Sequence, residues 1–116
     1  RFRRLYREKL LKLFESVDVI LAPATPCPAI RIGQSEISVN GVALPSRPNI
    51  GIFTQPLSFV GLPIISVPVF QPGTLPLGVQ VIAAPYNEAA VLRVAAQLEA
   101  MGVARAPVAT PAESLA

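Results

Sequence analysis

The sequence predicts an α/β fold in which helices cover part of a mixed β-sheet. A helical pattern over residues 2–16 leads directly into a short apolar run at 19–22. Two more apolar runs, at 64–70 and 77–83, precede a second helical pattern at 88–101. Helical and strand patterns that follow one another in this way are typical of layered α/β proteins.

The first helix is predicted from apolar residues that recur at steps of three or four, namely Phe2, Tyr6, Leu10, Leu13 and Val17. The run at 19–22 is short, contains β-branched residues and ends at Pro23, so we interpret it as a strand buried on both faces. Residues 23–35 contain three prolines and should form a stiff, extended loop. Open α/β sheets usually bind ligands at such a place, beyond the carboxyl end of a strand.

The middle of the chain is expected to contain a hairpin, a short helix and a strand pair. Asn40-Gly41, inside the alternating segment 37–44, is a strong signal for a two-residue hairpin turn. A short helix is predicted from about Gln55 to Val60. About six residues separate the two later apolar runs, too few for a parallel crossover, so an antiparallel pair is expected. Pro68 places the first of them at a sheet edge or a strand end.

The last predicted element is the helix over 88–101. Asn87 would cap its start and Gly102 would stop it. Residues 103–116, which are rich in alanine and proline, are expected to form a loose tail.

The composition is more apolar than a free-standing domain of 116 residues usually requires. Hydrophobic residues make up 52% and charged residues 15%, against a usual charged share of about 25%. A small domain has much surface for its volume and needs polar cover. We infer that much of this chain's surface packs against other protein; an ordinary apolar domain is the alternative. The chain also begins without methionine inside a helical pattern, which indicates a piece of a longer protein.

The net charge of +3 is concentrated at the start of the chain, where six basic residues lie: Arg1, Arg3, Arg4, Arg7, Lys9 and Lys12. Nucleic-acid sites usually add stacking aromatics or a known motif. Here the helical periodicity accounts for the two interleaved aromatics, so a solvated helix face is favoured and no nucleic-acid partner is expected. The single cysteine fits a reducing cytoplasm. No apolar run approaches the roughly 18 residues of a membrane span, so no membrane partner is expected.

The residue types exclude most catalytic sites within the chain. Histidine is absent, which removes Ser-His-Asp and Cys-His arrangements. One cysteine and scattered carboxylates cannot supply the usual zinc ligands, and the glycines are too far apart for a phosphate loop. Cys27, between two prolines, is more typical of an inert cysteine than of a nucleophile. We therefore assign no catalytic residue, no metal site and no cofactor.

Isolated polar residues in two proline-rich loops are the remaining candidates for a binding site. Thr25 follows the first strand, and Asn49, Thr54 and Gln55 lie in the irregular segment 45–63. Stiff loops that carry single polar groups suit substrate orientation. Capping of the local backbone by the same side chains is an equally good interpretation.

Four segments, in the same order and spacing, resemble the C-terminal region of the amidase signature family. They are Asp-Val-Ile-Leu-Ala-Pro-Ala-Thr-Pro at 18–26, Thr-Gln-Pro-Leu-Ser-Phe-Val-Gly-Leu-Pro-Ile-Ile-Ser-Val-Pro at 54–68, Leu-Pro-Leu-Gly-Val-Gln-Val-Ile at 75–82, and Asn-Glu at 87–88. The resemblance covers about residues 5–101. It implies that residues 1–102 are the C-terminal portion of the amidase signature fold, completed by the remainder of the amidase domain.

The family resemblance also implies hydrolysis of carbon–nitrogen bonds in small amides. Its members use a serine, a second serine at a cis peptide and a lysine, all upstream of the segments present here. No residue of this chain matches them, so the chain alone is not expected to be active. Thr25-Pro26 and Gly51–Gln55 match family loops near the acyl pocket, which makes Thr25, Gly51, Thr54 and Gln55 the expected substrate-binding residues.

Two interpretations of subfamily and role follow from these residues. Gly51 stands where glutamine-using relatives, such as the A subunit of glutamyl-tRNA amidotransferase, have an aspartate, which argues against glutamine. The segment 54–59 is more similar to the carboxybiuret hydrolase branch. The alternative to an amidase is a non-catalytic structural or binding subunit that associates with a partner through its apolar surface. A homo- or hetero-oligomer is compatible with either.

Overall fold

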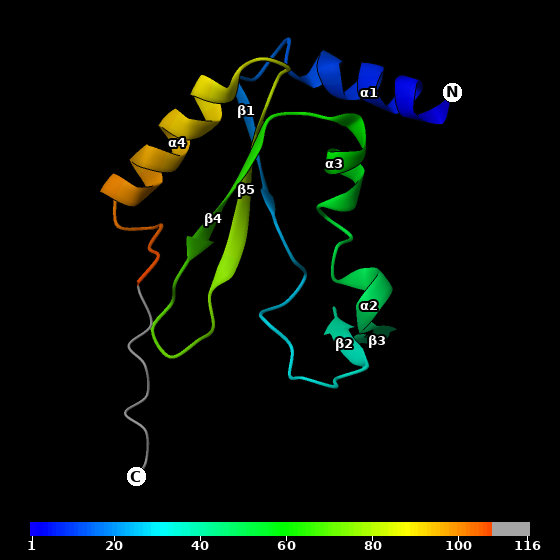
Figure 1. Ribbon diagram of the computed structural model, residues 1–116, viewed down its shortest axis with the longest axis vertical. Helices are drawn as coiled ribbons and strands as arrows, with labels where there is room; N and C mark the ends of the chain where they lie inside the picture. Colours follow the sequence, from blue (N-terminus) through cyan, green and yellow to red (C-terminus); the bar gives the residue numbers. More distant parts are fainter. Residues whose placement is uncertain (108–116) are drawn as a thin grey trace.

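The computed structural model describes residues 1–107, which form four helices and five strands (Figure 1). In chain order these are α1 (Phe2–Leu13), β1 (Val19–Pro23), β2 (Glu36–Val39), β3 (Val42–Pro45), α2 (Ser46–Asn49), α3 (Gln55–Val60), β4 (Ile64–Val69), β5 (Leu77–Ala83) and α4 (Glu88–Ala100). The predicted α/β architecture is confirmed, and all strand pairs within residues 1–107 are antiparallel.

β5 is the central strand of a three-stranded sheet, between β1 and β4. Ile82 of β5 lies in register with Ile20 of β1 and Ile64 of β4. The antiparallel pairing of β4 with β5 and the edge position of Pro68 are as predicted. The prediction that β1 is buried on both faces is wrong for these residues. Leu21 is 56% exposed, because β1 forms the other edge of the sheet.

Alternate residues of β5 face opposite sides of the sheet and form two small cores. On one side Ile82 packs with Val60 and Leu62 beneath side chains of α1 and α3. On the other side Val81 packs with Val91 of α4, and Figure 1 shows α4 and α3 on opposite sides of the sheet. Within residues 1–107, ten apolar residues are buried, whereas seventeen large hydrophobic residues are exposed. This distribution agrees with the inference that the apolar surface packs against other protein.

The β2–β3 hairpin forms a small separate unit with α2 (Figure 1). Asn40 and Gly41 both have positive φ angles, 51° and 79°, as the predicted two-residue turn requires. The helix α2 was not predicted. Buried Ser46 begins it and ties it to the preceding loop, because its Oγ donates to the Gln34 carbonyl at 2.9 Å and its N–H to the Ser35 carbonyl at 2.8 Å.

The ends of the long helices differ slightly from the predictions. The helix α1 ends at Leu13, earlier than expected, whereas α4 stops just before Gly102, whose φ of 72° is typical of a helix stop. Asn87 holds the N-cap position of α4, but its side chain makes no capping hydrogen bond. After α4, Ala104 pairs with Val69 of β4. Of the loose tail expected at 103–116, residues 108–116 lie outside the described residues.

Candidate functional site

The four predicted substrate-binding residues lie in two loops beside the sheet. Thr25 follows β1, Gly51 and Thr54 lie between α2 and α3, and Gln55 begins α3. Thr25, Gly51 and Thr54 are partly buried, whereas Gln55 is exposed. The geometry of the site therefore depends on what holds the two loops beside each other.

A single buried side chain, Gln80 of β5, bridges the end of β1, just before the first loop, and the second loop. Its Nε2 donates hydrogen bonds to the Pro23 carbonyl at 2.8 Å and to the Phe53 carbonyl at 3.1 Å. These acceptors precede Thr25 by two residues and Thr54 by one. Gln80 is 2% exposed and was missed by the sequence analysis. The available signal was a lone amide in an otherwise apolar strand.

The two threonine hydroxyls donate to the local backbone. Thr25 Oγ1 donates to the Cys27 carbonyl at 2.8 Å, and Thr54 Oγ1 donates to the Gly51 carbonyl at 3.2 Å. Capping of the backbone, the alternative left open by the sequence, is thus present in both loops. A hydroxyl that donates in this way keeps oxygen lone pairs that can accept a further hydrogen bond. The local bonds therefore fix each hydroxyl without removing it as an acceptor.

Gly51 and Gln55 share one small space. A Cβ atom added at Gly51 would lie 3.1 Å from Gln55 Nε2, so the Gln55 carboxamide lies where a side chain at position 51 would project. The polar group at this place is thus a neutral amide rather than a carboxylate.

Two shallow hollows contain predicted residues. One, of about 350 Å³, lies at the Pro23 end of β1 beside the start of β5 and includes Thr25 in an apolar lining. The other, of about 520 Å³, includes Gln55 beside Phe2, Tyr6 and Phe59. The structure thus links the loops through Gln80 but does not gather all four predicted residues around one closed cavity.

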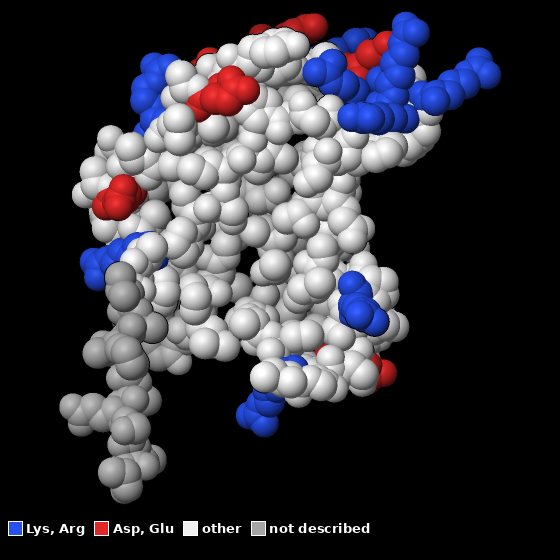
Figure 2. Space-filling view, viewed as in Figure 1, with Lys and Arg blue, Asp and Glu red and all other residues white. Residues whose placement is uncertain are grey.

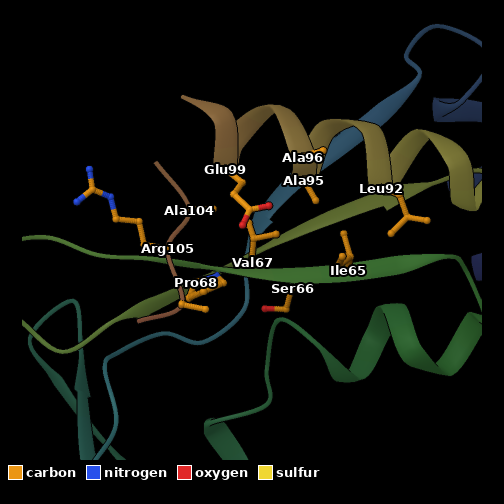
Figure 3. Close-up of a pocket in the computed structure, with 11 residues that line it drawn as sticks. Ile65, Ser66, Val67, Pro68, Leu92, Ala95, Ala96, Glu99, Ala104 and Arg105 are labelled. Carbon is orange, nitrogen blue, oxygen red and sulfur yellow. The ribbon is translucent and has the colours of Figure 1, made fainter. Parts of the chain in front are cut away.

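A third hollow lies along the groove between α4 and β4 and contains none of the predicted residues (Figure 3). Its volume is about 400 Å³. Apolar side chains line most of it, including Ile65 and Leu92, with Glu99 and Arg105 toward one end. Ser66 points away from α4 in this view. The groove therefore offers mainly an apolar packing surface.

Basic residues gather around α1 at one end of the molecule (Figure 2), and several make contacts within the chain. Arg4 forms an ion pair with Glu8 at 2.8 Å, and this hydrogen bond, with the charge of Glu8, raises the pKa of Arg4. Arg7 donates to the Val60 carbonyl at 3.1 Å, and Arg3 lies over the Phe59 ring. The basic side chains Arg3, Arg4 and Arg7 thus make contacts within this chain, either along α1 or with residues of α3.

Neither a metal cluster nor a membrane span is found in the described part of the chain. In residues 1–107 no three His, Cys, Asp or Glu side chains lie close enough together to hold a metal ion. Over the same residues, no helix has the length and apolar character needed to cross a membrane.

Comparison with known proteins identifies the family. A family profile described as "Amidase" matches residues 1–92. The chain is 48% identical over 108 residues to AtzE, a 1-carboxybiuret hydrolase subunit of Pseudomonas sp. (strain ADP), covering 90% of this chain and 23% of that protein. It is 36% identical over 98 residues to the A subunit of glutamyl-tRNA(Gln) amidotransferase from Myxococcus xanthus (strain DK1622), covering 84% of this chain and 19% of that protein.

Comparison of the fold with solved structures points to the same family. A solved structure, described as part of a vestigial protein complex that reveals the evolutionary origins of an s-triazine catabolic enzyme, superposes with a TM-score of 0.88 at 45% identity. The superposition covers 93% of this chain and 24% of that one. The chain thus spans about a fifth to a quarter of the length of these relatives, and its segments match their C-terminal part. On the profile, the relatives and the superposition together, the chain belongs to the amidase family.

Proposed function

We propose that the chain is the C-terminal part of an amide hydrolase of the Ser–cisSer–Lys type. The rest of the amidase domain would supply the three catalytic residues, and this chain would supply sheet core and two pocket loops. The observation that carries the proposal is the Gln80 bridge, which holds the loops bearing Thr25 and Thr54 to the same strand. If the catalytic residues lie in the rest of the domain, we expect this part to have the family fold and loops that its own contacts already hold in place.

In the proposed reaction, the neutral lysine accepts a proton through the second serine while the first serine attacks the amide carbonyl. Backbone N–H groups stabilise the resulting oxyanion. The lysine returns this proton through the second serine to the leaving nitrogen. The C–N bond then breaks, which releases the neutral amine or ammonia and leaves an acyl-serine that water hydrolyses. The role of this chain is to orient the acyl group, with the hydroxyl oxygens of Thr25 and Thr54 available as acceptors.

We propose a small amide other than glutamine as the substrate. Gly51 offers no carboxylate at the place where glutamine-using relatives have one, and the Gln55 carboxamide fills part of that space. A carboxamide can donate to a carboxylate or a carbonyl. The name of one relative, a 1-carboxybiuret hydrolase subunit, supports a small, urea-like acid as the class to test first.

The proposed partner is the remainder of the amidase domain. Leu21 of β1 and Leu92 of α4 are each more than half exposed, and the groove along β4 and α4 is mostly apolar. AtzE, the relative that is 48% identical, is named as a subunit, which supports a test for a hetero-oligomer as well as for a homo-oligomer. We retain the cytoplasm as the expected compartment, with neither nucleic acid nor membrane as a partner.

Ammonia release tests the proposal. The complete protein carrying these residues and the isolated chain 1–116 should each be given ureidoacetate, which is a small urea-like acid, malonamate and L-glutamine. We expect the complete protein to hydrolyse ureidoacetate or malonamate better than glutamine, and the isolated chain to hydrolyse none. Turnover by the isolated chain that a substitution within it abolishes would contradict the proposal, as would a preference for glutamine.

A matched pair of variants tests the loop assignment in the complete protein. Thr54→Val removes the hydroxyl and should raise KM about tenfold, the effect of one net hydrogen bond. Ser58→Ala, on the exposed surface of the neighbouring helix α3, should leave KM unchanged. Equal effects of the two changes would count against the loop assignment.

The exposed apolar surface also favours a second candidate, a non-catalytic subunit. It predicts that the complete protein binds its partner stably but releases no ammonia from any of the three amides. The same assay, with co-purification of the partner, separates the two functions.

A further inference from the structure

Gln80 occupies a position where an apolar side chain would suit the strand better. Of the two buried polar residues within 1–107, it is the more deeply buried, and its neighbours Val81 and Ile82 are fully buried. A carboxamide removed from water is favourable only when its hydrogen bonds are made. The reason for a glutamine at this position is therefore to be found in the groups to which it donates hydrogen bonds.

Those groups are two backbone carbonyls that are distant in sequence, one at the last residue of β1 and one in the loop before α3. Pro23 lies 57 residues before Gln80, and Phe53 lies 27 residues before it. One nitrogen donates to both carbonyls, at 2.8 and 3.1 Å. Because both acceptors belong to the main chain, the bridge ties the backbone of the loop at Phe53 to the end of β1, from which the loop with Thr25 starts. The spacing between the loops is thus set from the central strand of the sheet.

We propose that Gln80 is a positioning residue for the substrate, which acts by holding the loop with Gly51 and Thr54 at a fixed distance from the loop with Thr25. This inference rests on the proposed function, in which the two loops contact the acyl group. Because Gln80 is 2% exposed, it is not itself expected to contact the substrate. Its loss should weaken binding of the substrate more than it slows the chemical step, because the catalytic serines and lysine lie elsewhere.

Steady-state kinetics of the complete protein on malonamate, or on whichever of the three small amides it hydrolyses best, provide the first test. Gln80→Met keeps the size of the side chain but removes both donor hydrogens. We expect KM to rise about tenfold or more while kcat stays within about threefold. Ile82→Val, in the same strand and facing the same side of the sheet, is the matched control and should leave KM unchanged. Equal KM values for the two variants, or a parallel fall in kcat, would overturn the proposal.

Gln80→Asn provides a second variant if the methionine protein does not fold. It keeps the amide but shortens the side chain by one carbon, so it should not reach both carbonyls. The expected result is a smaller rise in KM, again without a matching loss of kcat. A KM equal to that of the unmodified protein would overturn the proposal.

Amide hydrogen exchange gives a readout that does not depend on turnover. In Gln80→Met or Gln80→Asn, amides of residues 50–54 should exchange about tenfold faster, whereas those of the hairpin at 36–45 should not change. Unchanged exchange at 50–54 would refute the bridge whatever the kinetics show. A complete protein that hydrolyses no amide, but in which these variants free residues 50–54, would refute the amidase function and the role in substrate positioning, leaving the bridge as a structural tie.

Discussion

Replacing Gly78 with alanine tests how tightly β1 packs on the central strand. A Cβ atom at this position would lie 2.8 Å from Ala24 Cβ and 3.0 Å from Ser66 Oγ. Carbon atoms in contact prefer about 3.5–4.0 Å, so Ala24 would have to move by about 1 Å. Its methyl group is fixed to the backbone, and its N–H donates to the Gly78 carbonyl at 2.8 Å. The added atom therefore pushes apart two strands that are hydrogen-bonded at the same place.

The expected loss of stability follows from two opposed effects. Overpacking of a well-packed site costs about 1–3 kcal/mol. Replacing glycine with alanine restricts the unfolded chain, which offsets about 0.4–1 kcal/mol of that loss. We therefore expect Gly78→Ala to lower the free energy of unfolding by about 1–2 kcal/mol.

Urea denaturation of the complete protein, followed by circular dichroism, measures this change. The double variant Ala24→Gly/Gly78→Ala moves the methyl group to the opposite strand and should be more stable than the sum of the two single changes predicts, by about 1 kcal/mol. A Gly78→Ala protein as stable as the unmodified one, or strict additivity in the double variant, would refute the steric reasoning.

Three further outcomes are expected. The isolated chain 1–116 should self-associate, because it exposes many apolar side chains. A monodisperse monomer in sedimentation velocity would contradict this expectation. Ile82→Ala should lower the free energy of unfolding of the complete protein by about 2–5 kcal/mol in urea denaturation, while the exposed Val42→Ala should change it by less than about 0.5 kcal/mol. Gly41→Ala should strain the hairpin turn, where φ is 79°, and speed amide exchange in residues 36–45 but not in β5; equal exchange in both would refute the assignment of the turn.

Local patterns predicted most of the elements but not their assembly. The helix at 55–60 and the strand at 77–83 were predicted with the observed bounds, because proline, glycine and periodicity define their ends. The four-residue helix α2 was missed, since one turn that contains Pro48 has no periodicity to detect. The pairing of β1 with β5 joins segments about 60 residues apart, a separation over which local periodicity carries no information.

The candidate site likewise divides into residues that the sequence could identify and an arrangement that it could not. Loop composition and the family resemblance selected Thr25 and Thr54 as residues, but they gave no reason for the two loops to meet. That reason lies in Gln80, whose two acceptors become neighbours only after the sheet has formed. A polar residue in an apolar strand marked the position, although its partners could be identified only from the fold.

The outer edges of the sheet connect the composition to the proposed function. Free strand edges with apolar faces promote aggregation, and natural proteins usually protect them. Here protection is partial. Pro23 and Pro68 lack a donor near the ends of β1 and β4, and Ala104 pairs with Val69, but no described strand pairs with the outer edge of β1. If the rest of the amidase domain covers these edges, the same packing accounts for the low charged fraction and for exposed Leu21.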